Sequence, residues 1–70
     1  MRFKEVQHLA NPMATYVVFS ESAGLISEHS FELEATKSFA AHLKEHIKRG
    51  ASPDALPCLY KRIREGWAII

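Results

Sequence analysis

The segment from Glu34 to Arg49 constrains the fold most strongly, because its apolar residues recur at helical spacing. Phe39, Leu43 and Ile47 lie four residues apart and form one apolar stripe. The other faces carry charged side chains, namely Lys37, Lys44, Glu45 and Lys48. Burying each apolar side chain of the stripe contributes about 1.5–3 kcal/mol. The pattern therefore predicts an amphipathic helix, and the flanking segments must supply the apolar surface that it packs against.

The length and the composition indicate a single domain over residues 1–70 with a small core. The single cysteine, Cys58, permits no intrachain disulfide and is typical of a reducing compartment. The first residues carry charges where a signal peptide needs an apolar run, and no apolar stretch approaches the roughly 20 residues that span a bilayer. We therefore expect a cytoplasmic protein without a membrane partner.

The first strand and its return are predicted on either side of a tight connection. Residues 15–20, TYVVFS, combine β-branched and aromatic side chains, which is typical of a strand. Residues 21–24 form the connection, in which Gly24 takes a positive φ. A returning strand over residues 25–33 would turn its odd positions towards the helix: Leu25, His29, Phe31 and Leu33. Glu28 and Glu32 would then point outward.

Residues 2–9 are compatible with two structures. The spacing of Phe3, Val6 and Leu9 suits a helix, whereas the position of the segment before Asn11-Pro12 and an apolar run suits a first strand. We expect the strand, which would add an extra N-terminal member to the sheet.

The segment after the helix also admits two readings. Gly50 should end the helix, and the two prolines of residues 51–57 indicate a loop. The tail then forms either a hairpin, with strands at 58–63 and 67–70, or a helix capped by Asp54. The apolar stripe of that helix would be Leu56, Leu59, Tyr60, Ile63 and Trp67. We favour the hairpin, because a helix would end near Gly66 and leave four apolar residues without a partner.

These elements predict an α+β fold, in which a small antiparallel sheet of two hairpins packs on one central amphipathic helix in ββαββ order. Residues 16–19 and 67–70 are apolar at consecutive positions, so both faces of the sheet carry apolar side chains. One helix covers only one face. The N-terminal segment, a second copy in a homodimer, or a partner protein should cover the other face.

No residue pattern indicates catalysis, a metal or a cofactor, and we expect a protein that is not an enzyme. Cys58 has no base assigned to it by the sequence, and the three glycines are isolated, so they form no phosphate-binding loop. His42 and His46 are four apart on the helix, but two ligands do not make a metal site.

Charge is distributed unevenly, with a formal net charge of −3 in residues 1–34 and +4 in residues 35–70. The basic half carries two clusters, Lys37, Lys44 and Lys48 on the helix and Lys61, Arg62 and Arg64 in the tail. Cations bind phosphates, and aromatic side chains beside the second cluster could stack on bases. A nucleic-acid-binding regulator is therefore the alternative function.

The function that we favour is binding to a larger protein. Aromatic and arginine side chains are the usual anchors of protein interfaces. The expected contact residues are Tyr60, Arg62, Arg64, Trp67 and Ile69, with Glu28 and Glu32 as an acidic edge that docks a basic surface. Small chains without a catalytic signature often act as inhibitors, antagonists or adaptors, including those of phages and mobile elements, and we expect such a role here.

Overall fold

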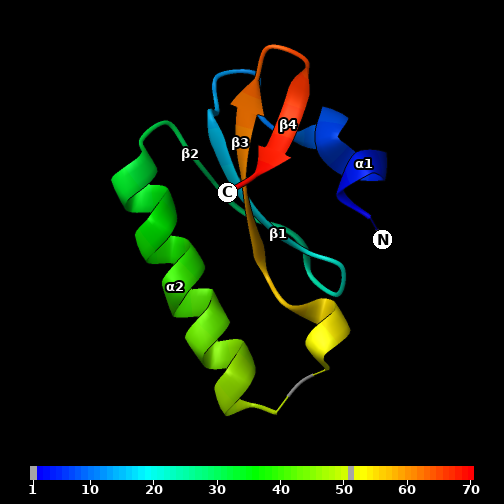
Figure 1. Cartoon of the computed structure of the whole chain (residues 1–70), viewed down its shortest axis with the longest axis vertical. Helices are drawn as coiled ribbons and strands as arrows, with labels where there is room; N and C mark the ends of the chain where they lie inside the picture. The colour runs from blue at the N-terminus through cyan, green and yellow to red at the C-terminus, as the bar shows by residue number, and fades with distance from the viewer. Residues whose placement is uncertain (1, 51) are drawn as a thin grey trace.

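A computed structural model describes residues 2–50 and 52–70 and has α+β architecture (Figure 1). Its elements in chain order are α1 (Phe3–Val6), the 3-10 turn η1 (Gln7–Leu9), β1 (Tyr16–Ser20), β2 (Gly24–His29), α2 (Glu32–Lys48), the 3-10 turn η2 (Pro53–Ala55), β3 (Cys58–Ile63) and β4 (Gly66–Ile69). The predicted combination of two antiparallel hairpins with one long helix is confirmed.

The four strands form one antiparallel sheet in the order β2-β1-β3-β4. β1 is central and all five of its residues are buried, with Val17 and Val18 at 0% exposure. A run of apolar residues at consecutive positions is typical of a strand that is covered on both faces. β3 and β4 confirm the predicted tail hairpin, and the turn between them consists of Arg64 and Glu65.

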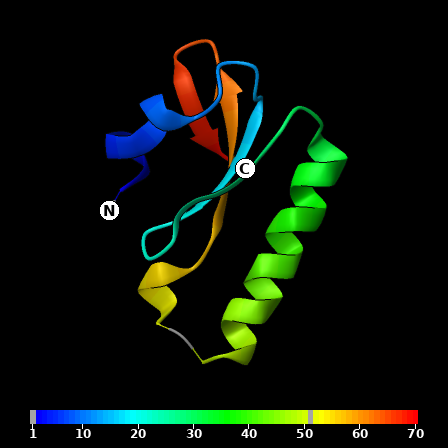
Figure 2. The ribbon, with the colours of Figure 1, turned by 180° about the vertical axis from the view of Figure 1, so that it is seen from behind.

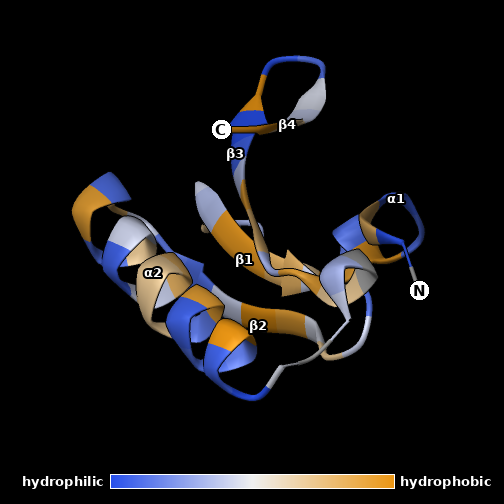
Figure 3. Ribbon diagram, turned by 60° about the horizontal axis from the view of Figure 1, so that its bottom comes forward, coloured by the Kyte–Doolittle hydropathy of each residue, from blue (hydrophilic) through white to orange (hydrophobic). Residues whose placement is uncertain are grey.

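The two faces of the sheet are covered by different helices. On one face, Ala35 and Phe39 of α2 pack in a cluster with Tyr16, Val18 and Leu59. On the other face, the cluster contains the N-terminal residues Phe3, Val6 and Ala10 and the β1 residues Val17 and Phe19. Figures 1 and 2 show the strands between α2 and α1, and in Figure 3 the hydrophobic β1 lies between these helices. The N-terminal segment, a second copy and a partner protein were the three candidates for covering this second face, and the N-terminal segment is the one that lies on it.

The predicted strand over residues 2–9 is wrong, because the segment is helical in α1 and η1. The physical reason lies in the spacing of its apolar residues. Phe3 and Val6 are three apart and both are buried against the same face of the sheet. Successive side chains of a strand alternate between faces, so a strand would turn one of these two residues into solvent.

The orientation predicted for Leu25 is also wrong, because a β-bulge interrupts the pairing of β1 with β2. Val18 pairs with Ser27 while the next residue, Phe19, pairs with Leu25, and Ile26 is the additional residue. The bulge places Leu25 in the α1-side cluster and Ile26 in the α2-side cluster. His29 pairs with Tyr16 and is half-buried, in agreement with its predicted inward position.

The returning strand is shorter than predicted, since it ends at His29 and α2 begins at Glu32. Phe31 is the N-cap residue and Leu33 lies in the first turn, and both side chains are exposed instead of facing the helix. Glu32 and Glu34 lie in this first turn, where carboxylates interact favourably with the helix dipole. Residues 32 and 33, whose pattern also fitted the end of the predicted strand, therefore belong to the first turn of the helix.

The apolar stripe of α2 is buried only in its first half. Ala35 is fully buried, Phe39 and Leu43 are half-buried, but Ile47 is 65% exposed, so its predicted burial is wrong. Figure 1 shows that the C-terminal end of α2 extends past the sheet. Gly50 has a φ of +65° after the helix, as predicted for a C-terminal glycine. In the predicted loop, residue 51 and the side chain of Asp54 lie outside the described part of the structure.

Candidate protein-binding groove

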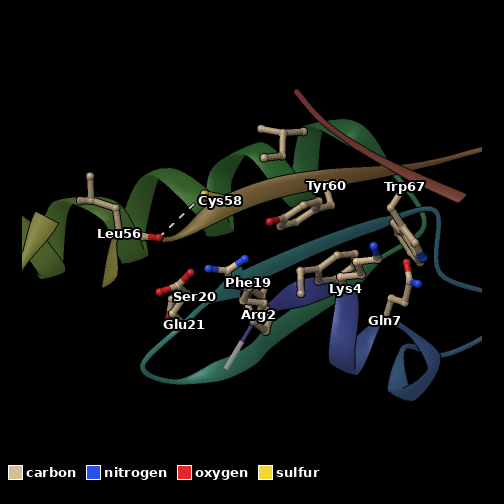
Figure 4. A pocket seen from close by; sticks show the side chains of 12 residues that line it. Arg2, Lys4, Gln7, Phe19, Ser20, Glu21, Leu56, Cys58, Tyr60 and Trp67 are labelled. Carbon is tan, nitrogen blue, oxygen red and sulfur yellow. Dashed lines mark hydrogen bonds between the residues drawn. The ribbon is translucent and has the colours of Figure 1, made fainter. Parts of the chain in front are cut away.

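A groove lies on the α1 side of the sheet, between α1 and the β3–β4 hairpin, with a volume of about 570 Å³ (Figure 4). One wall comes from α1 and its flanks, with Arg2, Phe3 and Lys4, and the opposite wall comes from Tyr60, Trp67 and Ile69. Leu56 and Cys58 line it at the beginning of β3, and Ser20 and Glu21 line it at the end of β1. In Figure 4, Tyr60 and Trp67 point from the hairpin towards α1.

The strand register explains why the predicted contact residues of the tail lie together. Tyr60 pairs with Ile69, and Arg62 pairs with Trp67, so all four side chains lie on the α1 face of the sheet. Arg64 is exposed in the turn and does not line the groove. The structure thus gathers four of the five predicted tail residues on one surface.

Phe3 is the centre of an aromatic cluster in this groove. Its ring stacks on Tyr60 at a centroid distance of 3.9 Å, and it meets Trp67 edge-on at 5.4 Å and Phe19 edge-on at 5.3 Å. Such ring pairs contribute about 0.5–1.5 kcal/mol each beyond their area burial. Phe3 was not among the predicted site residues, although its spacing from Val6 also suited a helix.

Arg62 fixes the orientation of Trp67. The guanidinium carbon lies 4.3 Å from the centroid of the indole ring, within cation–π distance. Arg62 Nε–H donates to the carbonyl oxygen of Ala14 at 3.0 Å, and Nη2–H donates to that of Asn11 at 3.2 Å. Arg62 therefore joins the hairpin to the segment before β1, and its hydrogen-bonding groups are partly used inside the molecule.

Replacing Arg62 with alanine should lower the free energy of unfolding by about 1.5–3 kcal/mol, because charge-assisted hydrogen bonds and the contact with Trp67 are lost together. Urea denaturation measures this change. Arg64→Ala is the matched control, since Arg64 is exposed in the turn and should change stability by less than about 0.5 kcal/mol. Equal effects of the two substitutions would contradict the structural role of Arg62.

Tyr60 is a groove residue whose pKa is raised above its usual value. Burial raises the pKa of its phenol, and electrostatic interactions with Cys58 and Glu21 raise it further. The folded protein therefore keeps the phenol proton at a pH where the unfolded chain has begun to lose it. The stability linked to this group is fully present below about pH 10 and falls as pH rises beyond that value. Tyr60→Phe should flatten this fall in denaturation curves measured at increasing pH, and an unchanged pH profile would contradict it.

The two residues of the predicted acidic edge, Glu28 and Glu32, lie on different elements. Glu28 Oε1 accepts the backbone N–H of Asn11 at 2.6 Å and so helps to position the segment before β1. Glu32 lies in the first turn of α2 instead of on the hairpin. Neither residue lines the groove.

The two basic clusters have different geometries. Lys37, Lys44 and Lys48 are exposed on α2, and their spacing of seven and four residues places them along one line of the helix. Lys61 and Arg62 are neighbours in β3, so their side chains lie on opposite faces of the sheet. The helix cluster is therefore a single stripe, whereas the tail cluster is divided.

His42, His46 and Cys58 make local hydrogen bonds. His42 Nδ1 lies 2.8 Å from the carbonyl oxygen of Ser38, and His46 Nε2 lies 2.9 Å from that of Ser52. The half-buried thiol of Cys58 lies 3.8 Å from the carbonyl oxygen of Leu56. Among the described side chains, which leave out those of residues 1, 51 and 54, no three histidine, cysteine or acidic groups lie together so that they could hold a metal ion.

Comparison with protein-family models, curated proteins and solved structures gives no match to this chain. In the part of the chain that the structure describes, no helix has the length and apolar character needed to cross a membrane. The function must therefore be inferred from the geometry of the chain itself.

Proposed function

We propose that this chain acts without catalysis by binding a larger protein through the groove between α1 and the β3–β4 hairpin. The observation that carries the proposal is that aromatic side chains line this groove beside an exposed apolar residue of an outer strand. Ile69 is 64% exposed although α1 covers the same face of the sheet over β1. An apolar surface of this kind, bordered by polar residues, is typical of a protein-binding site.

The groove has the residue types that anchor protein interfaces. Tyrosine, tryptophan and arginine are enriched among residues that contribute most to binding, and they act best at well-packed positions. Tyr60 and Trp67 are held in place by Phe3 and Arg62 before any partner binds. Since these side chains are already ordered, binding costs less conformational entropy than it would for flexible ones.

The proposed role is that of an inhibitor, antagonist or adaptor, of the kind that phages and mobile elements carry. A chain that occupies a surface of a larger protein through this groove can block or bridge that protein. This assignment of role rests on the groove. The compartment that we propose is the cytoplasm, because the single cysteine fits a reducing environment.

Affinity capture tests the proposal. The tagged chain is incubated with lysate of its source organism, with and without nuclease, and bound material is identified by mass spectrometry and nucleic-acid absorbance. We expect one defined protein that remains bound after nuclease treatment. Recovery of nucleic acid alone, and its loss after nuclease treatment, would contradict the proposal.

Nucleic-acid binding is the second candidate, and it is supported by the line of Lys37, Lys44 and Lys48 on α2. Three cations along one exposed helix face could contact successive phosphates. Gel mobility of labelled duplex and single strands at low salt measures this directly. An effect of Lys44→Glu on mobility would support this function, and unchanged mobility with the unmodified chain would exclude it.

A further inference from the structure

The sheet has two outer strands, and they differ in how they are protected against pairing with another strand. β2 contains the bulge at Ile26 and carries Glu28, two features that discourage the addition of a strand. β4 pairs with β3 without a register shift, and its residues Gly66–Ile69 include no charged residue and no proline. β4 therefore lacks the bulge and the charged residue that protect β2.

The register identifies which backbone groups of β4 point away from β3. The N–H of Ile70 donates to the carbonyl oxygen of Leu59 at 3.0 Å. In an antiparallel pair, hydrogen-bonded positions alternate with positions whose N–H and C=O groups point outward. Ala68, two residues before Ile70, therefore points its backbone groups towards β3, while Trp67 and Ile69 point theirs outward.

We propose that the protein partner contributes an extended segment that pairs with β4 as a fifth strand. This inference rests on the proposed function and specifies how the partner binds. The outward N–H and C=O groups of Trp67 and Ile69 would supply main-chain hydrogen bonds, which give affinity in this mode of recognition. The side chains of the same two residues line the groove, so the added strand would lie along its margin.

The surroundings of β4 define the chemistry of the segment. On the groove face, its side chains would lie beside Trp67 and Ile69, which favours apolar residues. On the opposite face, the side chains of the segment would lie beside Ala68, which is small. Lys61 of β3 is paired with Ala68, so its cationic side chain lies on this same face. The segment should therefore alternate apolar and acidic residues.

The charges near β4 favour such a segment over a second copy of this chain. The β3–β4 hairpin carries Lys61, Arg62 and Arg64 but only one carboxylate, Glu65. Two copies paired through β4 would bring together two hairpins that each carry more cations than carboxylates. An acidic partner segment would neutralise them instead.

Peptide selection on the intact chain tests this proposal. A phage-displayed library of random unstructured peptides is the probe, and selected peptides are titrated by fluorescence anisotropy against two synthetic chains, one unmodified and one N-methylated at Ile69. N-methylation replaces the outward N–H of Ile69 with a methyl group and leaves the hydrogen bonds between β4 and β3 in place, so thermal melting should show that the fold is retained. We expect selected sequences that alternate apolar and acidic residues, and an affinity that N-methylation lowers about tenfold or more, as the loss of edge hydrogen bonds implies.

Three outcomes would overturn strand addition. The first is peptide binding that survives N-methylation within about twofold but is lost in Ile69→Glu, which would leave groove binding intact. The second is failure to select any peptide, and the third is a dimer in sedimentation that N-methylation dissociates. The first outcome separates failure of this inference from failure of the proposed function.

Discussion

Replacing Phe3 with alanine is expected to lower the free energy of unfolding by about 3–5 kcal/mol, the usual cost of truncating a buried phenylalanine. Phe3 is buried and contacts the rings of Phe19, Tyr60 and Trp67. A domain of this size has a total stability of only about 5–15 kcal/mol or less. The substitution should therefore remove a large part of the stability and disorder the groove.

Chemical denaturation measures the effect, and Leu9→Ala is its matched control. Leu9 belongs to the same N-terminal segment and is also apolar, but its side chain is 64% exposed. Its replacement should change the free energy of unfolding by less than about 0.5 kcal/mol. If Phe3→Ala were as mild as Leu9→Ala, the N-terminal segment would not be the cover of this face of the sheet.

Replacing Ile69 with glutamate is expected to weaken partner binding by about 30-fold or more, since truncation or charging of a central interface residue commonly costs 2 kcal/mol or more. The new carboxylate would be desolvated beneath the partner beside apolar groups. Because Ile69 is exposed in the free chain, its replacement should leave the free energy of unfolding nearly unchanged. Calorimetric titration with the purified partner measures the change in affinity.

Ile47→Glu provides a control with the same change in charge and volume. Ile47 is 65% exposed, close to the 64% of Ile69, but lies in the last turn of α2 outside the groove. We expect partner affinity within about twofold of the unmodified chain, as is usual for residues outside an interface. Equal weakening by both substitutions would mean that charge, and not the groove, determines binding.

The sequence was sufficient to predict those helices and strands in which the spacing of apolar residues matches the faces that are buried in the structure. The β-branched and aromatic run at residues 15–20 predicts a strand, and β1 forms there with all five of its residues buried. The amphipathic stripe predicts α2, and the tail predicts a hairpin because residues 67–70 need a partner strand. Each of these predictions depends on interactions that are repeated along several residues.

The errors arose where contacts distant in sequence decide the structure. The helical form of residues 2–9 depends on Phe3 and Val6 reaching one face of a sheet that forms from later residues. The bulge at Ile26 reverses the side on which Leu25 lies, and one inserted residue leaves no signal in an alternating pattern. The exposure of Ile47 depends on the length of the sheet beneath α2, which its own periodicity cannot reveal.

The candidate site was predictable only in part. Side chains alternate between the two faces along each tail strand, so Tyr60, Trp67 and Ile69 lie on one face once the hairpin is assumed. Arg2, Phe3 and Lys4, which form the opposite wall, could not be assigned to the groove while their segment was expected to be a strand. Arg62 was predicted to contact a partner, and its hydrogen bonds to Ala14 and Asn11 give it a structural role as well.

Site-specific photo-crosslinking in cells of the source organism tests the central claim most directly. A photoreactive amino acid is placed at position 69 in the groove or at position 47 on α2, two positions of nearly equal exposure. We predict that position 69 crosslinks to one defined protein and that position 47 does not. Crosslinks to nucleic acid, or to the same protein from position 47 alone, would contradict binding of a protein through the groove.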